Sequence, residues 1–176
     1  MKKWTTRQIV IDAMLSAMCA VLGYFSLDLV NVKITFESVP VLIGALLFGP
    51  IDGMTIGGIG TLIYQLLRYG VTVTTPLWIL PYVLSGLIVG LYAKRKHYAM
   101  SQLQVTLIVV GSELLITLLN TFSLYVDSRI YGYYYPGIIL GALALRLVIC
   151  AIRGVAYSLV LPPLIKPIRT AYRRMN

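Results

Sequence analysis

Long blocks of apolar residues, separated by short polar or charged segments, follow one another along almost the whole chain. A hydrocarbon core about 30 Å thick needs roughly 20 helical residues at a rise of about 1.5 Å each. These blocks do not alternate as barrel strands would, and helices satisfy their own backbone hydrogen bonds in lipid. The pattern therefore predicts an all-α integral membrane protein, in which residues 1–176 form one domain with a bundle of six transmembrane helices. The six blocks are Ile9–Leu29, Ser38–Phe48, Met54–Leu67, Leu77–Ala93, Leu103–Tyr125 and Gly137–Leu161.

The second and third blocks are shorter than a full membrane span. They are joined by the sequence Phe48-Gly49-Pro50-Ile51-Asp52-Gly53, in which proline and glycine favour a tight turn. The sequence is apolar both before and after this turn, so two separate helices are expected here.

Composition and charge agree with a membrane environment. Hydrophobic residues make up 59% of the chain and charged residues 12%, with a mean hydropathy of +0.85, whereas soluble domains are about one quarter charged. An even number of spans places both termini on one side, and the side richer in Lys and Arg faces the cytoplasm. Both termini are therefore expected to be cytoplasmic, in a multi-pass protein of the cell membrane. Basic residues on the side of the termini are Lys2, Lys3, Arg7, Lys94, Arg95, Lys96, Lys166, Arg169, Arg173 and Arg174, against Lys33, Arg68 and Arg129 on the other.

Sequence signals for several other functions are missing. The net charge of +9 would suggest nucleic acid in a soluble protein, but here the basic residues gather at the ends of apolar blocks, where membrane lipid is the expected contact. The chain has no phosphate-binding GxxxxGK[ST] and no HExxH, and its one histidine, His97, lies in a basic cluster. Cys19 and Cys150 lie inside apolar blocks without metal-site spacing. We expect no nucleic acid, metal, cofactor or enzyme activity.

Two arginines, Arg146 and Arg153, lie inside the sixth block. A guanidinium in the bilayer centre costs at least about 2.5–3.5 kcal/mol, so each arginine needs a partner or a function. The two are seven residues apart and share one helix face. Glu113, on the fifth block, lies at the same depth from the cytoplasmic side as Arg153. This match predicts a structural ion pair between Glu113 and Arg153.

Arg146 lies two helical turns nearer the outer surface, at the depth of Asn120. No carboxylate is as clearly placed for Arg146 as Glu113 is for Arg153, and a fixed guanidinium can bind a carboxylate through two hydrogen bonds. We therefore expect Arg146 and Asn120 to face a cavity and bind an anionic ligand. The alternative is that Arg146 pairs with Asp127 or Glu37 and binds no ligand.

The fourth block and the loop before it supply further candidates. Trp78, Tyr82 and Ser85 fall at i, i+4 and i+7, and the preceding loop at residues 70–76 is extracellular by the charge count. Aromatic and hydroxyl groups suit a planar or hydroxylated ligand. An interfacial aromatic belt is the alternative for Trp78 and for the tyrosines at 131–135. The candidate substrate-binding residues are Arg146, Asn120, Trp78, Tyr82, Ser85, Thr75 and Glu37, with Tyr64, Gln65 and Arg68 as weaker candidates.

The first block carries a small-xxx-small pattern, Ala13-x-x-x-Ala17, extended by Ser16, Ala20 and Gly23. Small residues give a flat face against which another helix can pack closely. Ala13, Ala17 and Ala20 are therefore candidates for docking of a partner helix, and packing within the bundle itself is the alternative.

Together these features resemble the substrate-binding S components of energy-coupling factor (ECF) vitamin transporters. The resemblance covers nearly the whole chain. Its FGP turn and its LNT segment are most similar to the folate-type branch. The resemblance implies capture of a B vitamin from outside, with folate as first choice and pantothenate as second; both are carboxylates that Arg146 could bind. The shared features are the six-helix layout, the alanine motif, Phe36–Pro50 (FESVPVLIGALLFGP), Trp78–Tyr92 (WILPYVLSGLIVGLY) and Leu119-Asn120-Thr121.

The resemblance also implies partners. S components have no ATPase and work with a transmembrane coupling subunit and two cytoplasmic ATPases. By analogy, Ala13 and Ala17 dock on the coupling subunit, and the ligand sits near the extracellular side among helices four to six and the loops after helices one and three. The whole S component is expected to topple in the membrane during transport. Competing hypotheses are a self-sufficient proton-coupled carrier or channel, and a membrane-embedded enzyme.

Overall fold

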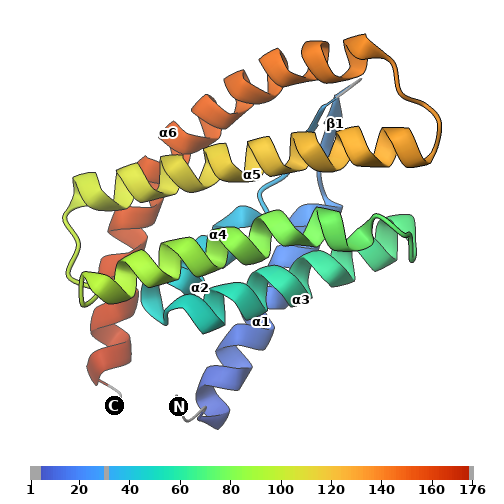
Figure 1. Ribbon diagram of the computed structural model, residues 1–176. Helices are drawn as coiled ribbons and strands as arrows, with labels where there is room; N and C mark the ends of the chain where they lie inside the picture. Colours follow the sequence, from blue (N-terminus) through green and yellow to red (C-terminus); the bar gives the residue numbers. More distant parts are fainter. Residues whose placement is uncertain (1–4, 30–31, 175–176) are drawn as a thin grey trace.

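A computed structural model describes residues 5–29 and 32–174 of the chain. Figure 1 shows a mainly helical molecule with one short hairpin that the apolar blocks did not predict. The expectation of a helical membrane protein is confirmed, and the short hairpin is an addition to it. In chain order, the elements are α1 (Thr6–Tyr24), β1 (Leu27–Leu29), β2 (Val32–Ile34), α2 (Ser38–Leu47), α3 (Pro50–Tyr69), α4 (Thr75–Arg95), α5 (Gln102–Ile130) and α6 (Pro136–Arg174).

The longer helices form a bundle around α2. Helices α3, α4 and α5 run alongside one another, and the first half of α6 follows α5 before α6 bends away (Figure 1). Helix α1 packs on α3, and the start of α1 lies on the same side of the molecule as the end of α6 (Figure 1). This arrangement leaves the hairpin near α5 and α6, where it covers one part of the bundle.

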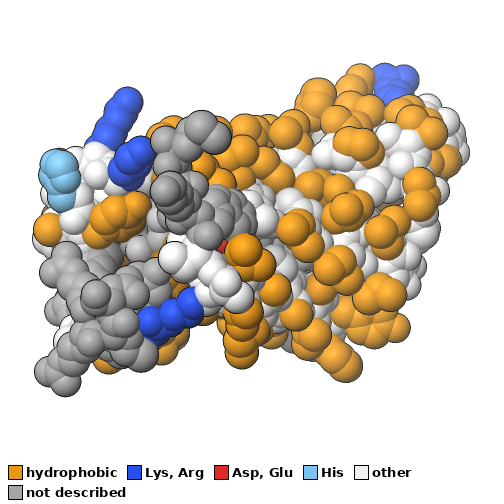
Figure 2. Space-filling model, turned by 90° about the horizontal axis from the view of Figure 1, so that it is seen from below, with side chains coloured by type: hydrophobic (Ala, Val, Ile, Leu, Met, Phe, Trp, Pro, Cys, Tyr) orange, Lys and Arg blue, Asp and Glu red, His pale blue; other side chains and the backbone are white. Residues whose placement is uncertain are grey.

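Four helices among the described residues are long and apolar enough to cross a membrane: α1, α4, α5 and the Pro136–Ile165 part of α6. Figure 2 shows a broad hydrophobic surface on one face, with most of its basic side chains and the histidine at one end. Helix α3 has the required length, with 20 residues, but it is less apolar and is not among the four. The molecule is therefore a helical membrane protein, and the number of six crossings stays a prediction.

Helix α2 replaces the expected second span, Ser38–Phe48, with a much shorter element. Its ten residues extend about 15 Å, or half of a hydrocarbon core. Nearly every side chain of α2 is buried, as expected for a helix that is apolar on all sides. Leu42 and Leu46 are completely buried in a core with residues from α4, α5 and α6, such as Val89, Val109 and Leu161. Helix α2 is therefore an internal element and too short to span a membrane alone.

Glycines let α3 and α4 approach each other closely. A Cβ atom on Gly86 would lie 2.4 Å from the backbone of Gly53, and one on Gly57 would lie 2.7 Å from the carbonyl oxygen of Tyr82. Gly53 and Gly57 on α3, like Gly86 and Gly90 on α4, are four residues apart, the spacing typical of close helix packing in membranes. These contacts fix the distance between α3 and α4, which together form one side of the cavity described below.

Several helix ends differ from the expected ones, and two of the differences have a clear physical reason. The first helix ends at Tyr24 instead of Leu29, because residues Leu27–Leu29 pair with Val32–Ile34 in an antiparallel hairpin. The last helix continues past Leu161 through three prolines to Arg174. Proline is tolerated inside membrane helices because neighbouring groups satisfy the freed backbone carbonyls, so proline was a poor marker of this helix end.

The glycine packing leads to a first prediction. Gly86→Ala should lower the free energy of unfolding by about 1–3 kcal/mol, because the added methyl group collides with backbone rather than with a movable side chain. Thermal unfolding of the purified protein in detergent would measure it. Gly111→Ala is the matched control: nothing lies within 4 Å of its Cβ position, and alanine favours helix more than glycine does. Equal stability of the two variants would contradict the prediction.

Candidate functional site

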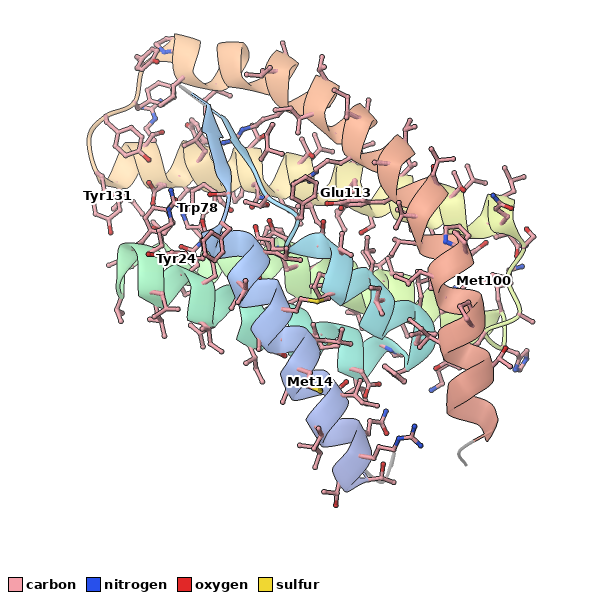
Figure 3. All side chains as sticks on the ribbon, turned by 180° about the vertical axis from the view of Figure 1, so that it is seen from behind. Met14, Tyr24, Trp78, Met100, Glu113 and Tyr131 are labelled. Carbon is pink, nitrogen blue, oxygen red and sulfur yellow. The ribbon has the colours of Figure 1, made fainter. Side chains whose placement is uncertain are left out.

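A cavity of about 730 Å³ lies between the helices at one end of the molecule. Its walls are formed by the ends of α3 and α5, the first turns of α4, the first half of α6, and the segment between β2 and α2. Figure 3 shows Trp78 and Tyr131 together at this end of the molecule, far from Met100 at the other end. The volume is in the range of small-molecule binding sites.

Most of the predicted binding residues meet in this cavity, although they come from four helices and a loop. The structure also brings the weaker candidates of α3 to the same wall. The predicted residues that line the cavity are Arg146, Asn120, Trp78, Tyr82 and Glu37, together with Tyr64, Gln65 and Arg68.

Ser85 and Thr75 are not among the described residues that line the cavity. Ser85 is completely buried and shares a hydrogen bond with Ser112 of α5. The hydroxyl of Thr75 accepts a hydrogen bond from the backbone N–H of Thr72, at 3.0 Å, and so shapes the loop before α4. Helical spacing placed Ser85 on the correct face of α4 but too far along the helix, so both residues support the wall instead of forming it.

Of the two arginines of α6, Arg153 forms an ion pair with Glu113, whose side chain is completely buried. Figure 3 shows Glu113 near the middle of α5. Arg153 also donates a hydrogen bond to the backbone carbonyl of Thr35, at 2.9 Å. The pair brings α5 and α6 together at one depth and connects both helices to the segment before α2. The contact with Thr35 and the position of Arg153 on the cavity wall were not foreseen from the sequence.

The other arginine of α6, Arg146, has a different environment. Its Nη1 lies 3.5 Å from the hydroxyl of Thr121, which is a marginal hydrogen bond. Among the described residues its Nε has no hydrogen-bond partner, and no ion pair joins it to Asp127 or Glu37. The Oδ1 atom of Asn120, on the same cavity wall, is also without a partner within that part of the chain. The partly buried guanidinium of Arg146 is a suitable site for an anion. The Oδ1 atom of Asn120 accepts hydrogen bonds, so it would take one from a ligand N–H or O–H, and only the amide NH2 of Asn120 could donate to the anion.

Asp127, the alternative partner of Arg146, is bonded to other side chains. It accepts hydrogen bonds from the hydroxyls of Thr74 and Tyr133. Partial burial and the nearby Asp127 carboxylate raise the pKa of Tyr133, so this hydroxyl stays protonated and can donate. Asp127 therefore connects the loop before α4 to the loop after α5.

Aromatic side chains form much of the remaining wall. They come from α3, α4 and the loop after α5, whereas the loop at residues 72–75 contributes threonines. Aromatic faces favour planar ligands, since ring systems pack well by stacking or edge-to-face contact. The aromatic residues on the wall are Tyr64, Tyr69, Trp78, Tyr82, Tyr131 and Tyr133.

The small residues of α1 point in two directions. Ala13 and Ala17 are exposed on the outer face of the helix, next to Met14, which Figure 3 shows pointing away from the bundle. Ala20 is only 6% exposed, and Ser16 lies against α3, with its carbonyl oxygen 2.9 Å from a Cβ placed on Gly60. Ala20 therefore packs inside the bundle, Ala13 and Ala17 alone of the three alanines are exposed, and docking on this helix stays a prediction.

Comparison with known proteins agrees with this fold. A family described as "ECF transporter, substrate-specific component" matches residues 7–165. The chain therefore belongs to the substrate-specific components of ECF transporters. A solved structure, "Crystal structure of FolT bound with folic acid", shares the fold, with a TM-score of 0.68, 21% sequence identity and coverage of 90% of this chain and 92% of that chain. No curated protein matches the sequence.

The ion pair leads to a second prediction. Glu113→Gln should lower the free energy of unfolding by about 3–5 kcal/mol, because it leaves the Arg153 guanidinium buried without a counter-charge. Thermal unfolding in detergent would measure the loss. The double variant Glu113→Gln, Arg153→Met removes both charges and should recover much of the stability. A double variant less stable than Glu113→Gln would show that loss of charge pairing is not the cause.

Proposed function

We propose that this protein captures a B vitamin outside the cell as the S component of an ECF transporter, with folate as its ligand and pantothenate as the second candidate. One observation carries this proposal: Arg146 presents a cation without an acidic partner among the described residues to a ligand-sized cavity. Membership of the substrate-specific components supports a transport function. The folic acid bound by the similarly folded FolT supports folate.

The same proposal places the cavity on the extracellular side. Helix α4 runs from the cavity, near Trp78, to Lys94 and Arg95 in its last turn. Lys and Arg accumulate on the cytoplasmic side of membrane proteins. With the termini in the cytoplasm, the hairpin and α2 together complete one of six crossings, and the ligand enters from outside.

In the proposed complex, Arg146 and Asn120 hold a carboxylate of the ligand, while aromatic residues such as Trp78 and Tyr82 pack against its ring. Folate has a fused planar ring and two carboxylates, whereas pantothenate has one carboxylate and no ring. The six aromatic residues on the wall therefore favour folate. Burial of the ligand between helices also strengthens the contact between guanidinium and carboxylate, because the surroundings are poor in water.

Energy for transport comes from partners in this proposal. A transmembrane coupling subunit docks on Ala13 and Ala17, and two cytoplasmic ATPases drive the toppling that carries the ligand across. The exposure of both alanines supports this assignment, because a partner helix needs an accessible face of small residues.

The third prediction concerns Arg146. Arg146→Ala should weaken binding of folic acid to the purified protein about 10- to 150-fold, the loss expected for a hydrogen bond to a charged group worth about 1.5–3 kcal/mol. Isothermal titration calorimetry in detergent without ATP would measure this. Arg129→Ala is the matched control, since Arg129 stacks on Tyr134 at 4.1 Å and does not line the cavity. Normal affinity in Arg146→Ala would contradict the proposed binding mode.

The fourth prediction concerns docking. Ala13→Trp or Ala17→Trp should leave folic acid affinity unchanged but abolish uptake in proteoliposomes that contain the complete complex with ATP, because the added bulk prevents close helix contact. Leu118→Trp, on the exposed face of α5, is the control and should transport normally. Undiminished uptake by the alanine variants would remove the docking assignment. Uptake driven by a pH gradient with this chain alone would favour a self-sufficient carrier.

A further inference from the structure

Two loops that belong to different helix pairs meet at one carboxylate on the cavity wall. The loop at residues 70–74 joins α3 to α4, and the loop at residues 131–135 joins α5 to α6. Both loops lie at the same end of the molecule (Figure 1), and both contribute residues to the cavity. The hydroxyl of Thr74 donates to Oδ1 of Asp127, and the hydroxyl of Tyr133 donates to Oδ2. A single side chain therefore joins the two loops.

Thr74 uses its hydroxyl for this contact instead of for its own helix. It is the N-cap residue of α4, where a threonine usually accepts a hydrogen bond from the helix backbone, but its side chain makes no capping bond among the described residues. Its hydroxyl also lies 3.3 Å from that of Thr72, which shares a hydrogen bond of 2.9 Å with the hydroxyl of Thr75. Three threonines of this loop are thus connected to α5 through Asp127.

Backbone geometry places Tyr133 against the same carboxylate. Helix α5 ends at Ile130, and Gly132 has a φ of 75°, the left-handed conformation that favours glycine after a helix end. The backbone N–H of Tyr133 then donates to the carbonyl of Ser128 at 3.1 Å, as in a Schellman motif. This turn brings the Tyr133 side chain back to Asp127. Tyr133 is 43% exposed, so its release uncovers little of the core.

Both loops are built to move easily apart from this contact. Each begins with a glycine of positive φ, 72° at Gly70 and 75° at Gly132, and a Cβ placed on either would meet no described atom within 4 Å. In the first loop, Val71 and Val73 are exposed by 86% and 81%. Loops with few buried apolar contacts open at a low free energy. The hydrogen bonds to Asp127 therefore oppose an opening that the loops themselves resist only weakly.

We propose that Asp127 couples the two loops into one gate, which opens before a ligand enters or leaves the cavity. The inference rests on the proposed function, in which the ligand arrives from outside at this end. While both hydroxyls bind one carboxylate, the loops are too close at that point for a ring to pass between them. Release of either hydroxyl loosens both loops, because Asp127 connects them. Asp127 is thus a positioning residue that sets the rates of ligand exchange.

The fifth prediction is tested first without a ligand, by hydrogen–deuterium exchange of the purified full-length protein in detergent. Tyr133→Phe removes one hydroxyl from the gate and keeps the ring. Exchange of the backbone amides at residues 70–75 should become about tenfold faster, although the substitution lies in the other loop, because one hydrogen bond to a charged group is lost. Thr74→Val should do the same to residues 131–135.

Tyr135→Phe is the matched control. It removes a hydroxyl from the same loop, but among the described residues Tyr135 neither bonds to Asp127 nor lines the cavity. Exchange at residues 70–75 should stay as in the unsubstituted protein. Coupling of the loops is overturned if Tyr133→Phe speeds exchange only in its own loop.

Ligand exchange is measured by stopped-flow tryptophan fluorescence with folic acid as the probe, since Trp78 lies on the cavity wall. Tyr133→Phe and Thr74→Val should raise the association and dissociation rate constants together, each about tenfold. The Kd should change less than about threefold, because a gate alters the barrier to passage and not the bound state. A residue that only contacts the ligand would raise the dissociation rate constant alone, and that result would overturn the gate.

The two measurements separate this inference from the proposed function. If the unsubstituted protein does not bind folic acid, folate is excluded as the ligand, and hydrogen exchange still decides whether Asp127 couples the loops. If folic acid binds, but neither the exchange of residues 70–75 nor the rate constants respond to Tyr133→Phe, the gate is overturned and the proposed function stands. Thermal unfolding of each variant checks that the fold is retained.

Discussion

The buried ion pair between Glu113 and Arg153 is the interaction on which the inner half of the cavity depends. Neither charge is tolerable alone in the membrane interior, so the pair fixes α5 and α6 at one relative depth. Arg153 also bonds the carbonyl of Thr35, which places the start of α2 and the carboxylate of Glu37. One electrostatic constraint therefore organises two helices, a connecting segment and an internal helix.

In the proposed function, the two arginines of α6 divide structure and binding between two positions on one helix face. They have the same chemistry and lie two turns apart, but a carboxylate matches only Arg153 among the described residues. Arg146 instead shares the cavity wall with Asn120 and aromatic side chains. In the proposed function, the partly buried Arg146 has no fixed counter-ion in the empty protein, so binding is favoured for a ligand that supplies an anionic group.

The features that could be predicted from the sequence were those set by membrane depth. Glu113 and Arg153 could be matched by counting residues along two long helices, and the same count left Arg146 without a partner. Contacts that depend on helix rotation or on the path of a connection could not be found in this way. Ala20 and Ser85 face neighbouring helices, and the pairing of residues 27–29 with 32–34 shortens the first apolar block without a strong turn signal in the sequence. The glycine spacing of α3 and α4 was a usable signal that the sequence interpretation missed.

The division of roles between the arginines can be tested most directly by determining an experimental structure of the purified protein with folic acid bound. We expect a carboxylate of the ligand within hydrogen-bond distance of the Arg146 guanidinium, while Glu113 and Arg153 remain paired with each other. A ligand whose carboxylates contact Arg153 in place of Glu113, or an Arg146 side chain bonded to an acidic residue or turned toward lipid, would contradict this division.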